Sequence, residues 1–388
     1  MMKAPISAED RNDRMVVLRF TAAGMVAVDP GDGKPGRWQA ASTPAFRHAI
    51  PAPMRPPLHP WLPNGRTGDA TLYLAATPGS GAMLFDCGDL SALPPRHLLR
   101  VETLLVSHTH MDHWADFDRL LRLLIGRPAR LQLVGPAGFG GHVFHRLNAY
   151  AWNLADRIGA DLVFEVVEVT STGPWPRTRF RLHGGFAAEP LPPCPAASDG
   201  TVLRQGGLRI RAAALDHGTP CLGFAVEQDH QLNILAEALA ARGLPAGPWL
   251  VGLKHAVASG AADALPIPLP DGNAVPLGTL RDLVAVTPGQ RIAYVTDIAD
   301  TPANRAGAIG LARGADILFI EAPFAAAHAA LALDRQHLTT TAAGEIARAA
   351  GVRRVEPFHF SPRYQGQAAR LLAEVAAAAG PDIAAPTG

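Results

Sequence analysis

The chain has 388 residues, with 35 Lys and Arg against 34 Asp and Glu, so its formal net charge is +1. A charge this close to zero gives no global attraction toward nucleic acid or an anionic membrane. Hydrophobic residues make up 48% of the chain, which provides a large core and excludes global disorder. Three scattered cysteines exclude a disulfide framework or a cysteine zinc cluster, and they favour a reducing compartment.

The N-terminus carries no apolar stretch of the kind that a signal peptide needs, because charged residues interrupt the first twenty positions. No run approaches the roughly 18 uninterrupted apolar residues of a membrane span. We therefore expect a soluble, cytoplasmic protein with no membrane partner.

Short strands alternate with longer helical stretches along most of the chain, which predicts an α/β protein whose sheets are covered by helices. The predicted strands are 70–77, 82–88, 101–108, 130–136, 161–169, 207–217, 221–228, 291–297, 316–322 and 353–360. Helical periodicity is clearest in 114–126, 137–157, 232–242, 339–350 and 366–379.

Three stretches look irregular. Residues 41–68 and 170–206 are rich in proline, and the second of them interrupts the strand pattern. Residues 231–275 hold one helix, followed by the Gly-Pro-rich segment GLPAGPWL (243–250). No internal repeat is visible, and no linker is polar enough to separate two independent domains, so we expect a single domain over 1–388.

The sharpest feature is the run HTHMDH (108–113), which follows an apolar strand and precedes an amphipathic helix. Its potential ligands are His108, His110, Asp112 and His113. Histidines two residues apart cannot share a helix face, so this is not the spacing of a helical zinc protease. Such side chains converge only in a tight loop that metal holds together. The run therefore predicts a metal site rather than a solvated polar loop.

This motif and the segments downstream resemble the metallo-β-lactamase superfamily, and within it the ribonuclease Z family of tRNA 3′-processing endonucleases. The resemblance extends from LFDCGD (84–89) to HFSPRY (359–364). It implies a metallo-β-lactamase fold, a four-layer αβ/βα sandwich of two facing mixed sheets, with the metals at one edge between the halves. It also implies that Asp86 braces the metal loop.

The resemblance implies the remaining site residues as well. LDHGTPCLGF (215–224) supplies His217, RIAYVTD (291–297) ends in the bridging Asp297, and HFSPRY supplies His359. One ion would be held by His108, His110 and His217, the other by Asp112, His113 and His359, with Asp297 between the two. DILFIEAPF (316–324) and RQHLTTTAAGEIA (335–347) supply Glu321 and the catalytic histidine, His337.

Neutral imidazoles and carboxylates are the ligands that zinc prefers when thiols are absent, although Mn²⁺ or Fe²⁺ could occupy the same donors. Two divalent ions would lower the pKa of a bound water to about 7 and stabilise both the attacking and the departing oxygen of a phosphodiester. Asp112 would orient or deprotonate that water, and His337 would protonate the leaving alkoxide. Glu321 would fix the tautomer of His337.

Three further features have a plainer explanation beside the functional one. Ser361 and Arg363 follow a predicted ligand and are candidates for substrate binding, but Arg363 could equally anchor the terminal helix. The segment GPAGFGG (135–141) lacks the Gly-Lys-Ser/Thr ending of a phosphate loop and is better explained as a turn. The nine other histidines are best explained as surface or core residues.

In the ribonuclease Z family a protruding arm grips tRNA, and residues 231–275 occupy the place of that arm here. This segment has two basic residues, Arg242 and Lys254, against three acidic ones, Glu237, Asp263 and Asp271. An arm that binds RNA phosphates should be basic. An N-terminal extension, 1–15, and an insert, 170–206, also depart from the family pattern.

The leading hypothesis is a metal-dependent phosphodiesterase of the ribonuclease Z type, which cuts RNA, and tRNA precursors at their 3′ trailers, with a dinuclear zinc-activated hydroxide. The resemblance implies a homodimer. The alternative is a small-molecule hydrolase on the same scaffold, acting on a cyclic nucleotide, another phosphodiester, an ester or a lactone. A catalytically silent RNA-binding homologue would need a missing ligand, and none is missing.

Overall fold

The computed structural model describes residues 17–21, 24–28, 58–75 and 81–384. The chain divides into two compact units, Met1–Met54 and Arg55–Gly388. In the first unit the described part is one hairpin, in which β1 (Val17–Thr21) pairs antiparallel with β2 (Gly24–Val28). The expected N-terminal extension 1–15 lies outside the described residues. All other described elements belong to the second unit.

An eight-stranded mixed sheet forms the first half of the second unit, with the strand order β10-β9-β8-β7-β6-β5-β4-β3. Pairing is parallel from β5 to β8 and antiparallel toward both margins. The strands are β3 (His59–Trp61), β4 (Leu72–Ala75), β5 (Ala82–Phe85), β6 (Val101–Leu105), β7 (Ala129–Pro136), β8 (Leu162–Val169), β9 (Trp175–Arg181) and β10 (Glu189–Cys194).

A six-stranded mixed sheet forms the second half, with the order β11-β12-β13-β18-β19-β20. Its strands are β11 (Thr201–Gln205), β12 (Leu208–Asp216), β13 (Pro220–Gln228), β18 (Arg291–Val295), β19 (Ile317–Glu321) and β20 (Val355–Phe358). Because β18, β19 and β20 run parallel, the segments that follow them leave the sheet at the same edge.

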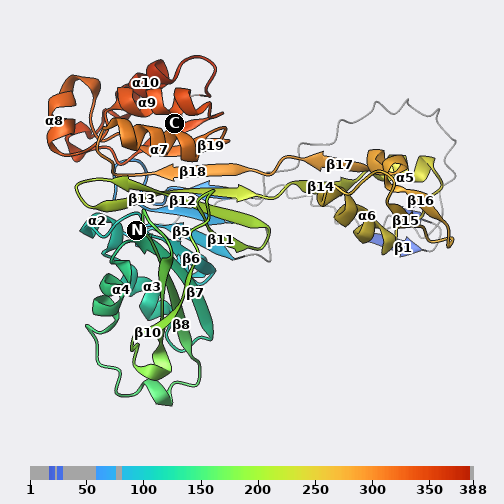
Figure 1. Ribbon diagram of the computed structural model, residues 1–388, viewed down its shortest axis with the longest axis horizontal. Helices are drawn as coiled ribbons and strands as arrows, with labels where there is room; N and C mark the ends of the chain where they lie inside the picture. The colour runs from blue at the N-terminus through green and yellow to red at the C-terminus, as the bar shows by residue number, and fades with distance from the viewer. Residues whose placement is uncertain (1–16, 22–23, 29–57, 76–80, 385–388) are drawn as a thin grey trace, which may run out of the picture. The chain divides into compact units, whose positions relative to one another are not determined.

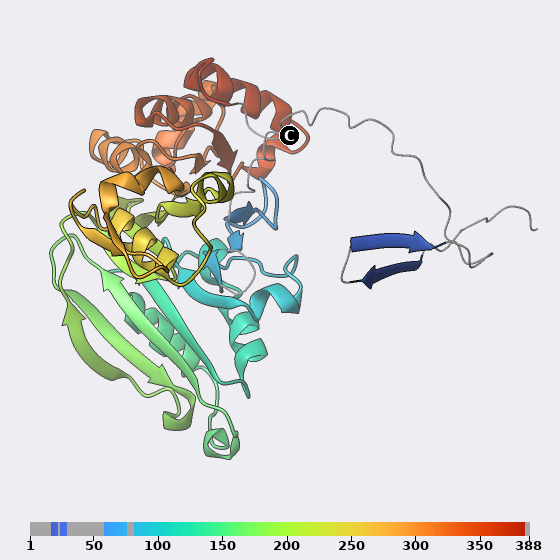
Figure 2. The same ribbon diagram turned by 90° about the vertical axis from the view of Figure 1, so that its right-hand side faces the viewer.

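Helices cover the outer face of each sheet (Figure 1). Those of the first half are α1 (Pro95–Leu98), α2 (Met111–Trp114), α3 (Phe117–Leu124) and α4 (Phe139–Leu147). Those of the second half are α7 (Pro302–Ala312), α8 (Ala329–Asp334), α9 (Thr340–Ala350) and α10 (Ala368–Ala379). Figure 2 shows α7, α9 and α10, at the red end of the colour scale, apart from the green strands of the first sheet. None of the helices in the described ranges is long and apolar enough to cross a bilayer.

Three apolar clusters show how these layers are held together. One lies between the sheets and includes Phe85 and Phe224. A second joins α3 and α4 to the first sheet, and a third joins α7, α9 and α10 to the second sheet. The order is therefore helices, sheet, sheet, helices, which confirms the predicted four-layer sandwich of two mixed sheets.

A separate small subdomain, residues 231–287, is inserted between β13 and β18; we call it the arm subdomain. In it β14 (Gln231–Ile234) pairs with β17 (Val284–Thr287), and β15 (Pro266–Pro268) pairs with β16 (Ala274–Pro276). With α5 (Ala236–Ala241) and α6 (Trp249–Ala258) these strands enclose a core of their own, in which Leu253, Leu277 and Leu283 are fully buried. Sequence analysis predicted one helix here and missed α6 and the short strands.

All ten predicted strands are confirmed, but the interpretation of 170–206 as irregular is wrong. That segment contains β9, β10 and β11. Its prolines conceal the strands, since β10 has the sequence EPLPPC. As the outermost strand of its sheet, β10 can lack N–H donors on its free side without breaking the ladder.

Three predicted helices are shorter than expected. The helix predicted over 137–157 is α4 and ends at Leu147, whose carbonyl accepts a 2.8 Å hydrogen bond from the Trp152 indole N–H. The helix predicted over 114–126 is divided between α2 and α3. The first residues of 232–242 pair in β14, so that helix covers only α5.

Candidate metal centre

The predicted ligands come from several elements that end at one edge of the two sheets. His108 follows β6, His217 joins β12 to β13, Asp297 follows β18, and His359 follows β20. Their ligand atoms fall into two groups, each within 4.8 Å: His108, His110, His217 and Asp297 in one, and Asp112, His113, Asp297 and His359 in the other. This is the division that the resemblance implies, and Asp297 is common to both groups.

Asp297 lies at the centre of the arrangement and is 2% exposed. Its Oδ2 lies 3.4 Å from His113 Nε2, 3.7 Å from His217 Nε2 and 4.0 Å from His108 Nε2, and its Oδ1 lies 3.0 Å from His359 Nδ1. Burial opposes ionisation, but the charges of His359 and His113 hold the pKa of this carboxyl well below its usual range. Asp297 is therefore a carboxylate surrounded by imidazoles.

Three of the histidines have one ring nitrogen fixed by a neighbour. The Nδ1 of His113 lies 3.0 Å from Asp86 Oδ2, and the Nδ1 of His217 lies 2.8 Å from the Gln336 carbonyl oxygen. The Nδ1 of His108 lies 3.1 Å from the Ser107 hydroxyl, which itself donates to Asp86. These neighbours hold one ring proton of each histidine on Nδ1, so that Nε2 is the nitrogen that faces the cluster.

The Nε2 atoms of His108 and His113 are buried and have no hydrogen-bond partner within the described ranges. Unpartnered buried nitrogens are rare in folded proteins. A neutral imidazole whose Nδ1–H is held by a carboxylate or carbonyl is the form in which histidine binds a metal through Nε2. The donor set of imidazoles and carboxylates therefore fits two divalent ions.

Backbone strain is concentrated at this edge. Asp86 and His359 directly follow β5 and β20, and both have left-handed backbone, with φ of 55° and 58°. Such conformations cost a non-glycine residue free energy and cluster at functional sites. Gly88 is required for close packing, because a Cβ there would lie 1.8 Å from the Asp112 carbonyl oxygen.

Asp112 is the most accessible carboxylate of the cluster, with 44% of its side chain exposed. Burial would raise its pKa, but the hydrogen bond from His359, at 3.3 Å, and the charge of His113 lower it to about 2. Burial, with the charge of His113, lowers the pKa of His108 to about 2. At neutral pH the first group is ionised and the second is neutral, which are the forms that bind metal.

His337 lies beside the cluster, with its ring centroid 4.7 Å from that of His217. Its Nδ1 lies 2.7 Å from Oε2 of the fully buried Glu321. The Oε1 of Glu321 accepts from the N–H groups of Ile298, at 2.8 Å, and Leu338, at 3.2 Å. Burial lowers the pKa of His337, but the charge and hydrogen bond of Glu321 raise it to about 9. The pair has the geometry of a proton donor with a fixed orientation.

The two predicted substrate-binding residues lie at the margin. Arg363 is exposed, and its guanidinium carbon lies 5.8 Å from the centroid of Phe324, whose ring in turn lies 5.9 Å from that of His337. The Ser361 N–H donates to the Pro323 carbonyl. Both residues thus lie near the segment that carries His337. Their role in substrate binding stays a prediction.

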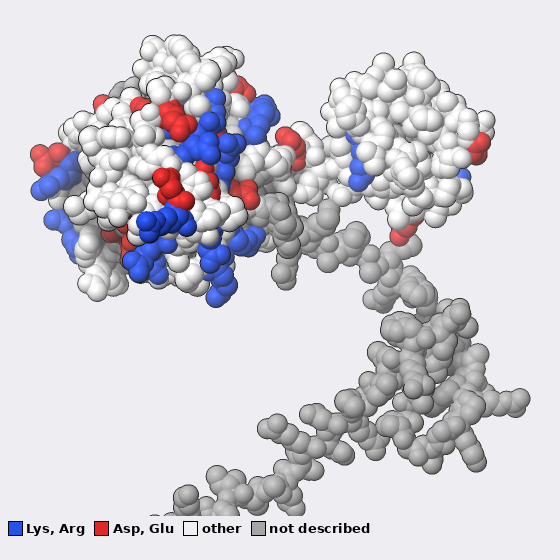
Figure 3. Space-filling view, turned by 90° about the horizontal axis from the view of Figure 1, so that it is seen from below, with Lys and Arg blue, Asp and Glu red and all other residues white. Residues whose placement is uncertain are grey.

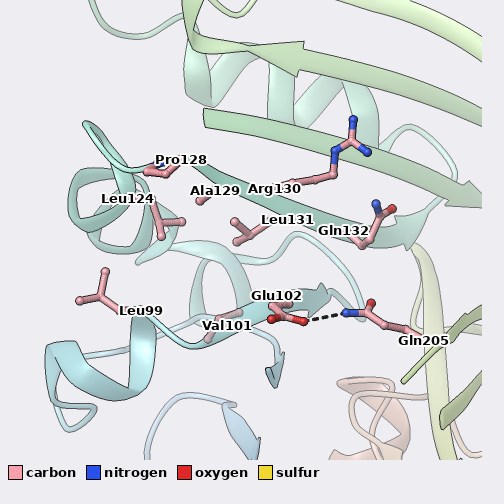
Figure 4. A pocket seen from close by; sticks show the side chains of 10 residues that line it. All are labelled: Leu99, Val101, Glu102, Leu124, Pro128, Ala129, Arg130, Leu131, Gln132 and Gln205. Atoms are coloured by element: carbon pink, nitrogen blue, oxygen red, sulfur yellow. Dashed lines mark hydrogen bonds between the residues drawn. The ribbon is translucent and has the colours of Figure 1, made fainter. Parts of the chain in front are cut away.

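Two other features lie away from the chemistry. In the predicted turn 135–141 the Gly138 N–H donates to Glu168 Oε2 at 2.6 Å, so a carboxylate already occupies the start of α4. A pocket of about 390 Å³ lies where β6 and β7 begin, at the ends of these strands away from the metal edge (Figure 4). Here the Gln205 side chain donates to Glu102 at 2.8 Å. Arg130 and Gln132 also line it, and none of the predicted site residues does.

Sequence analysis missed three residues that hold the cluster: Ser107, Tyr294 and Gln336. Ser107 was detectable, since it directly precedes the motif. Tyr294, whose hydroxyl donates to Asp86 Oδ2 at 2.8 Å, lies in an apolar strand and gives no local signal. Gln336 acts through its backbone carbonyl, which no sequence pattern identifies.

Comparison with known proteins agrees with this geometry. The chain is 33% identical over 311 residues to a ribonuclease Z of Deinococcus radiodurans, covering 77% of this chain and 88% of that protein. It is 37% identical to a ribonuclease Z of Thermobifida fusca, covering 79% and 83%. The chain belongs to the ribonuclease Z family. It is therefore an enzyme of a metal-dependent hydrolase family, as predicted.

This ribonuclease Z family member is also 31% identical to a ribonuclease BN of Cronobacter sakazakii, over 76% of this chain and 84% of that one. No protein-family model matches the chain. Among solved structures, a metallo-β-lactamase fold protein of Bacillus subtilis has a TM-score of 0.46 at 15% identity, covering 80% of this chain and 89% of that one. The human short-form tRNase Z has a TM-score of 0.44 at 15% identity, covering 78% and 92%.

Proposed function

We propose that this ribonuclease Z family member hydrolyses phosphodiester bonds in RNA and removes 3′ trailers from tRNA precursors. The observation that carries the proposal is the double group of ligand atoms around Asp297 with the His337–Glu321 pair beside it. Relatives named ribonuclease Z, at 33% and 37% identity over most of the chain, support the choice of substrate.

We assign the centre two divalent ions, with Zn²⁺ as the first choice and Mn²⁺ or Fe²⁺ as compatible alternatives. His108, His110 and His217 would hold one ion; Asp112, His113 and His359 would hold the other, with Asp297 between them. When bound, the ions supply a water nucleophile at neutral pH and stabilise negative charge on phosphoryl oxygens. Two carboxylates among the ligands offset part of the cationic charge.

The chain's own residues would move the protons. Asp112, ionised and partly exposed, orients or deprotonates the attacking water. His337, held through Nδ1 by Glu321, donates from Nε2 to the departing 3′ oxygen, so that the product ends in a 3′-hydroxyl. The exposed guanidinium of Arg363 pairs with a substrate phosphate.

A cleavage assay tests this proposal directly. A tRNA precursor with a 3′ extension is compared with bis(p-nitrophenyl) phosphate, using zinc-loaded and manganese-loaded protein and Asp112→Ala as the inactive control. We expect cleavage just after the discriminator base, far more efficient than hydrolysis of the chromogenic diester. Equal activity of Asp112→Ala would contradict the assigned mechanism, whichever substrate is used.

A second candidate function, hydrolysis of a small phosphodiester, is favoured by the charges of the arm subdomain. Its basic residues are Arg242, Lys254 and Arg281, and its acidic ones are Glu237, Asp263, Asp271 and Asp282, which gives 3 − 4 = −1. Arg242 pairs with Asp282, and Arg281 pairs with Asp263. Figure 3 shows few charged side chains on the face of this subdomain that is in view. Hydrolysis of the chromogenic diester without tRNA cleavage would favour this candidate.

We also propose a homodimer, which rests on the resemblance alone. Light scattering with size-exclusion chromatography tests it, and a mass near the 40.8 kDa of a single chain would contradict it.

A further inference from the structure

Tyr294 is a buried polar residue close to the centre that the proposed chemistry does not use. It lies on β18, three residues before Asp297, and none of its surface is exposed. Its ring lies between Phe85 and Phe358, with a centroid distance of 5.2 Å to each. Its hydroxyl donates to Asp86 Oδ2 at 2.8 Å. Burial and the charge of Asp86 raise the pKa of Tyr294, so the hydroxyl stays protonated and remains a donor.

The acceptor of this bond, Asp86, is the group that fixes His113. Its Oδ2 accepts from Tyr294, from the Ser107 hydroxyl at 2.8 Å and from His113 Nδ1 at 3.0 Å, and its Oδ1 accepts from the Ser107 N–H at 2.7 Å. A carboxylate that is fully buried needs all of these donors to offset its lost hydration. The donors also fix the rotation of the carboxylate, and thereby the orientation of the His113 ring.

The bond connects the two halves of the molecule at the place where the two ligand groups meet. Asp86 and His113 belong to the first half, whereas Tyr294 and Asp297 lie at the end of one strand in the second half. Next to the hydrogen bond between Tyr294 and Asp86, His113 Nε2 and Asp297 Oδ2 lie 3.4 Å apart. A small shift of β18 against β5 would change that separation, and the Tyr294 hydroxyl opposes such a shift.

We propose that Tyr294 is a positioning residue for metal binding. Its hydroxyl holds Asp86 in the orientation that lets His113 and Asp297 bind the same ion. The inference rests on the proposed ligand set. It concerns the group of Asp112, His113, Asp297 and His359 more than the group of His108, His110 and His217, because Asp86 holds His113 directly.

The test is Tyr294→Phe, which removes only the hydroxyl and keeps the ring between Phe85 and Phe358. Tyr73→Phe is the matched control, because Tyr73 is also buried, at 2% exposure, and its hydroxyl donates to the His97 carbonyl at 3.3 Å, away from the centre. Binding of Zn²⁺ is measured by chelator competition, binding of Co²⁺ by its visible spectrum, and stability by urea unfolding of the metal-free proteins.

In Tyr294→Phe we expect the weaker of the two binding steps to lose about 10-fold in affinity, as is typical when a group outside the ligand shell is removed. The Co²⁺ spectrum of that step should change, and kcat should recover when metal is saturating, since Tyr294 touches no substrate. Tyr73→Phe should bind both ions normally. Unchanged metal affinity in Tyr294→Phe, or an equal loss in both variants that follows their unfolding free energies, would overturn the inference.

If Tyr294→Phe does not fold, Ser107→Ala removes another donor from the same carboxylate and is judged by the same readouts. Metal binding is measured without any substrate, so the result does not depend on which diester the enzyme cleaves. Absent RNA cleavage with normal metal binding would contradict the proposed function only.

Discussion

The metal edge of the sandwich and the arm subdomain use charged residues in opposite ways. At the metal edge four imidazole nitrogens lie within 4.0 Å of the Asp297 carboxylate, and the buried Nε2 atoms of His108 and His113 make no hydrogen bond among the described residues. In the arm subdomain two of three basic residues are paired with aspartates. The metal edge therefore has ligand atoms that can bind a cation, whereas most basic side chains of the arm subdomain are already paired with carboxylates.

This difference in charge pairing concerns two separate requirements of a ribonuclease Z, catalysis and RNA binding. Catalysis needs the metal edge, and every predicted residue of that edge is brought together. Electrostatic attraction of RNA needs unpaired basic side chains, because most nonspecific affinity for nucleic acid comes from neutralised phosphates. The arm subdomain has instead a net charge of −1 and an apolar core of its own. The catalytic assignment is therefore better supported than any role of this subdomain in binding RNA.

The largest expected effect concerns the metal edge. Asp297→Ala should abolish activity on every substrate and reduce the metal content, because this carboxylate is common to both ligand groups. Metal analysis and the cleavage assay check this, with the exposed Asp271→Ala in the arm subdomain as the control. Full metal content in Asp297→Ala would remove the basis for a shared ligand.

His337→Ala should keep its metal and lose about 10²–10⁴-fold in kcat on RNA, as expected for loss of a general acid. The loss on bis(p-nitrophenyl) phosphate should be much smaller, because p-nitrophenolate departs without a proton. His142→Ala, at an exposed position on α4, is the control. Equal losses of kcat on both substrates would indicate that His337 is a metal ligand and not the proton donor.

Much of this architecture could be predicted because the signals are local. Apolar strands such as 101–105 and 317–321 carry their pattern in a few residues, and all ten predicted strands exist. The motif HTHMDH predicted the clustered donors because four potential ligands within six residues converge only in a tight loop that metal holds together. The strand β10 was missed because proline is excluded only from positions that need an N–H, and an edge strand has positions that do not.

Two groups that hold the cluster, the Tyr294 hydroxyl and the Gln336 carbonyl, could not be predicted, for a different reason. Tyr294 and Asp86 are 208 positions apart, and their contact exists only once the two sheets face each other. The carbonyl of Gln336, which fixes His217, is a backbone group that every residue has. Sequence patterns identify side chains with unusual chemistry, whereas the groups that orient them depend on the packed fold.

Removal of the arm subdomain would sharpen the comparison. Ile234 and Val284 are paired across β14 and β17, so a short glycine-containing turn can replace residues 236–282. We expect normal hydrolysis of bis(p-nitrophenyl) phosphate. For the tRNA precursor, the slope of log KM against log salt concentration should change by less than about 0.9, which is the change expected for the loss of one phosphate contact. A larger fall in that slope would show that the subdomain does bind RNA phosphates.

The smallest effect is expected away from the metal edge, at Glu227 near the end of β13, whose side chain is 7% exposed and contacts three arginines. Burial would raise its pKa, but the hydrogen bonds of Arg209 and Arg211 and the charge of Arg291 lower it below the ordinary value of 4.5. Stability from this carboxylate is therefore present above pH 4.5 and is lost as the pH falls through the lower, folded-state pKa.

Glu227→Gln should consequently lower the free energy of unfolding by about 1–3 kcal/mol at pH 7, because the arginines lose their shared counter-charge. The difference from the unsubstituted protein should shrink as the pH falls below 4.5, where the carboxylate of Glu227 also becomes neutral. Urea unfolding between pH 3 and pH 7 measures this, with the exposed Glu102→Gln as control. Metal binding and kcat should be unchanged, since charge far from the metal edge stabilises the fold without taking part in the chemistry. A difference that persists undiminished at low pH would mean that the glutamine perturbs packing rather than charge.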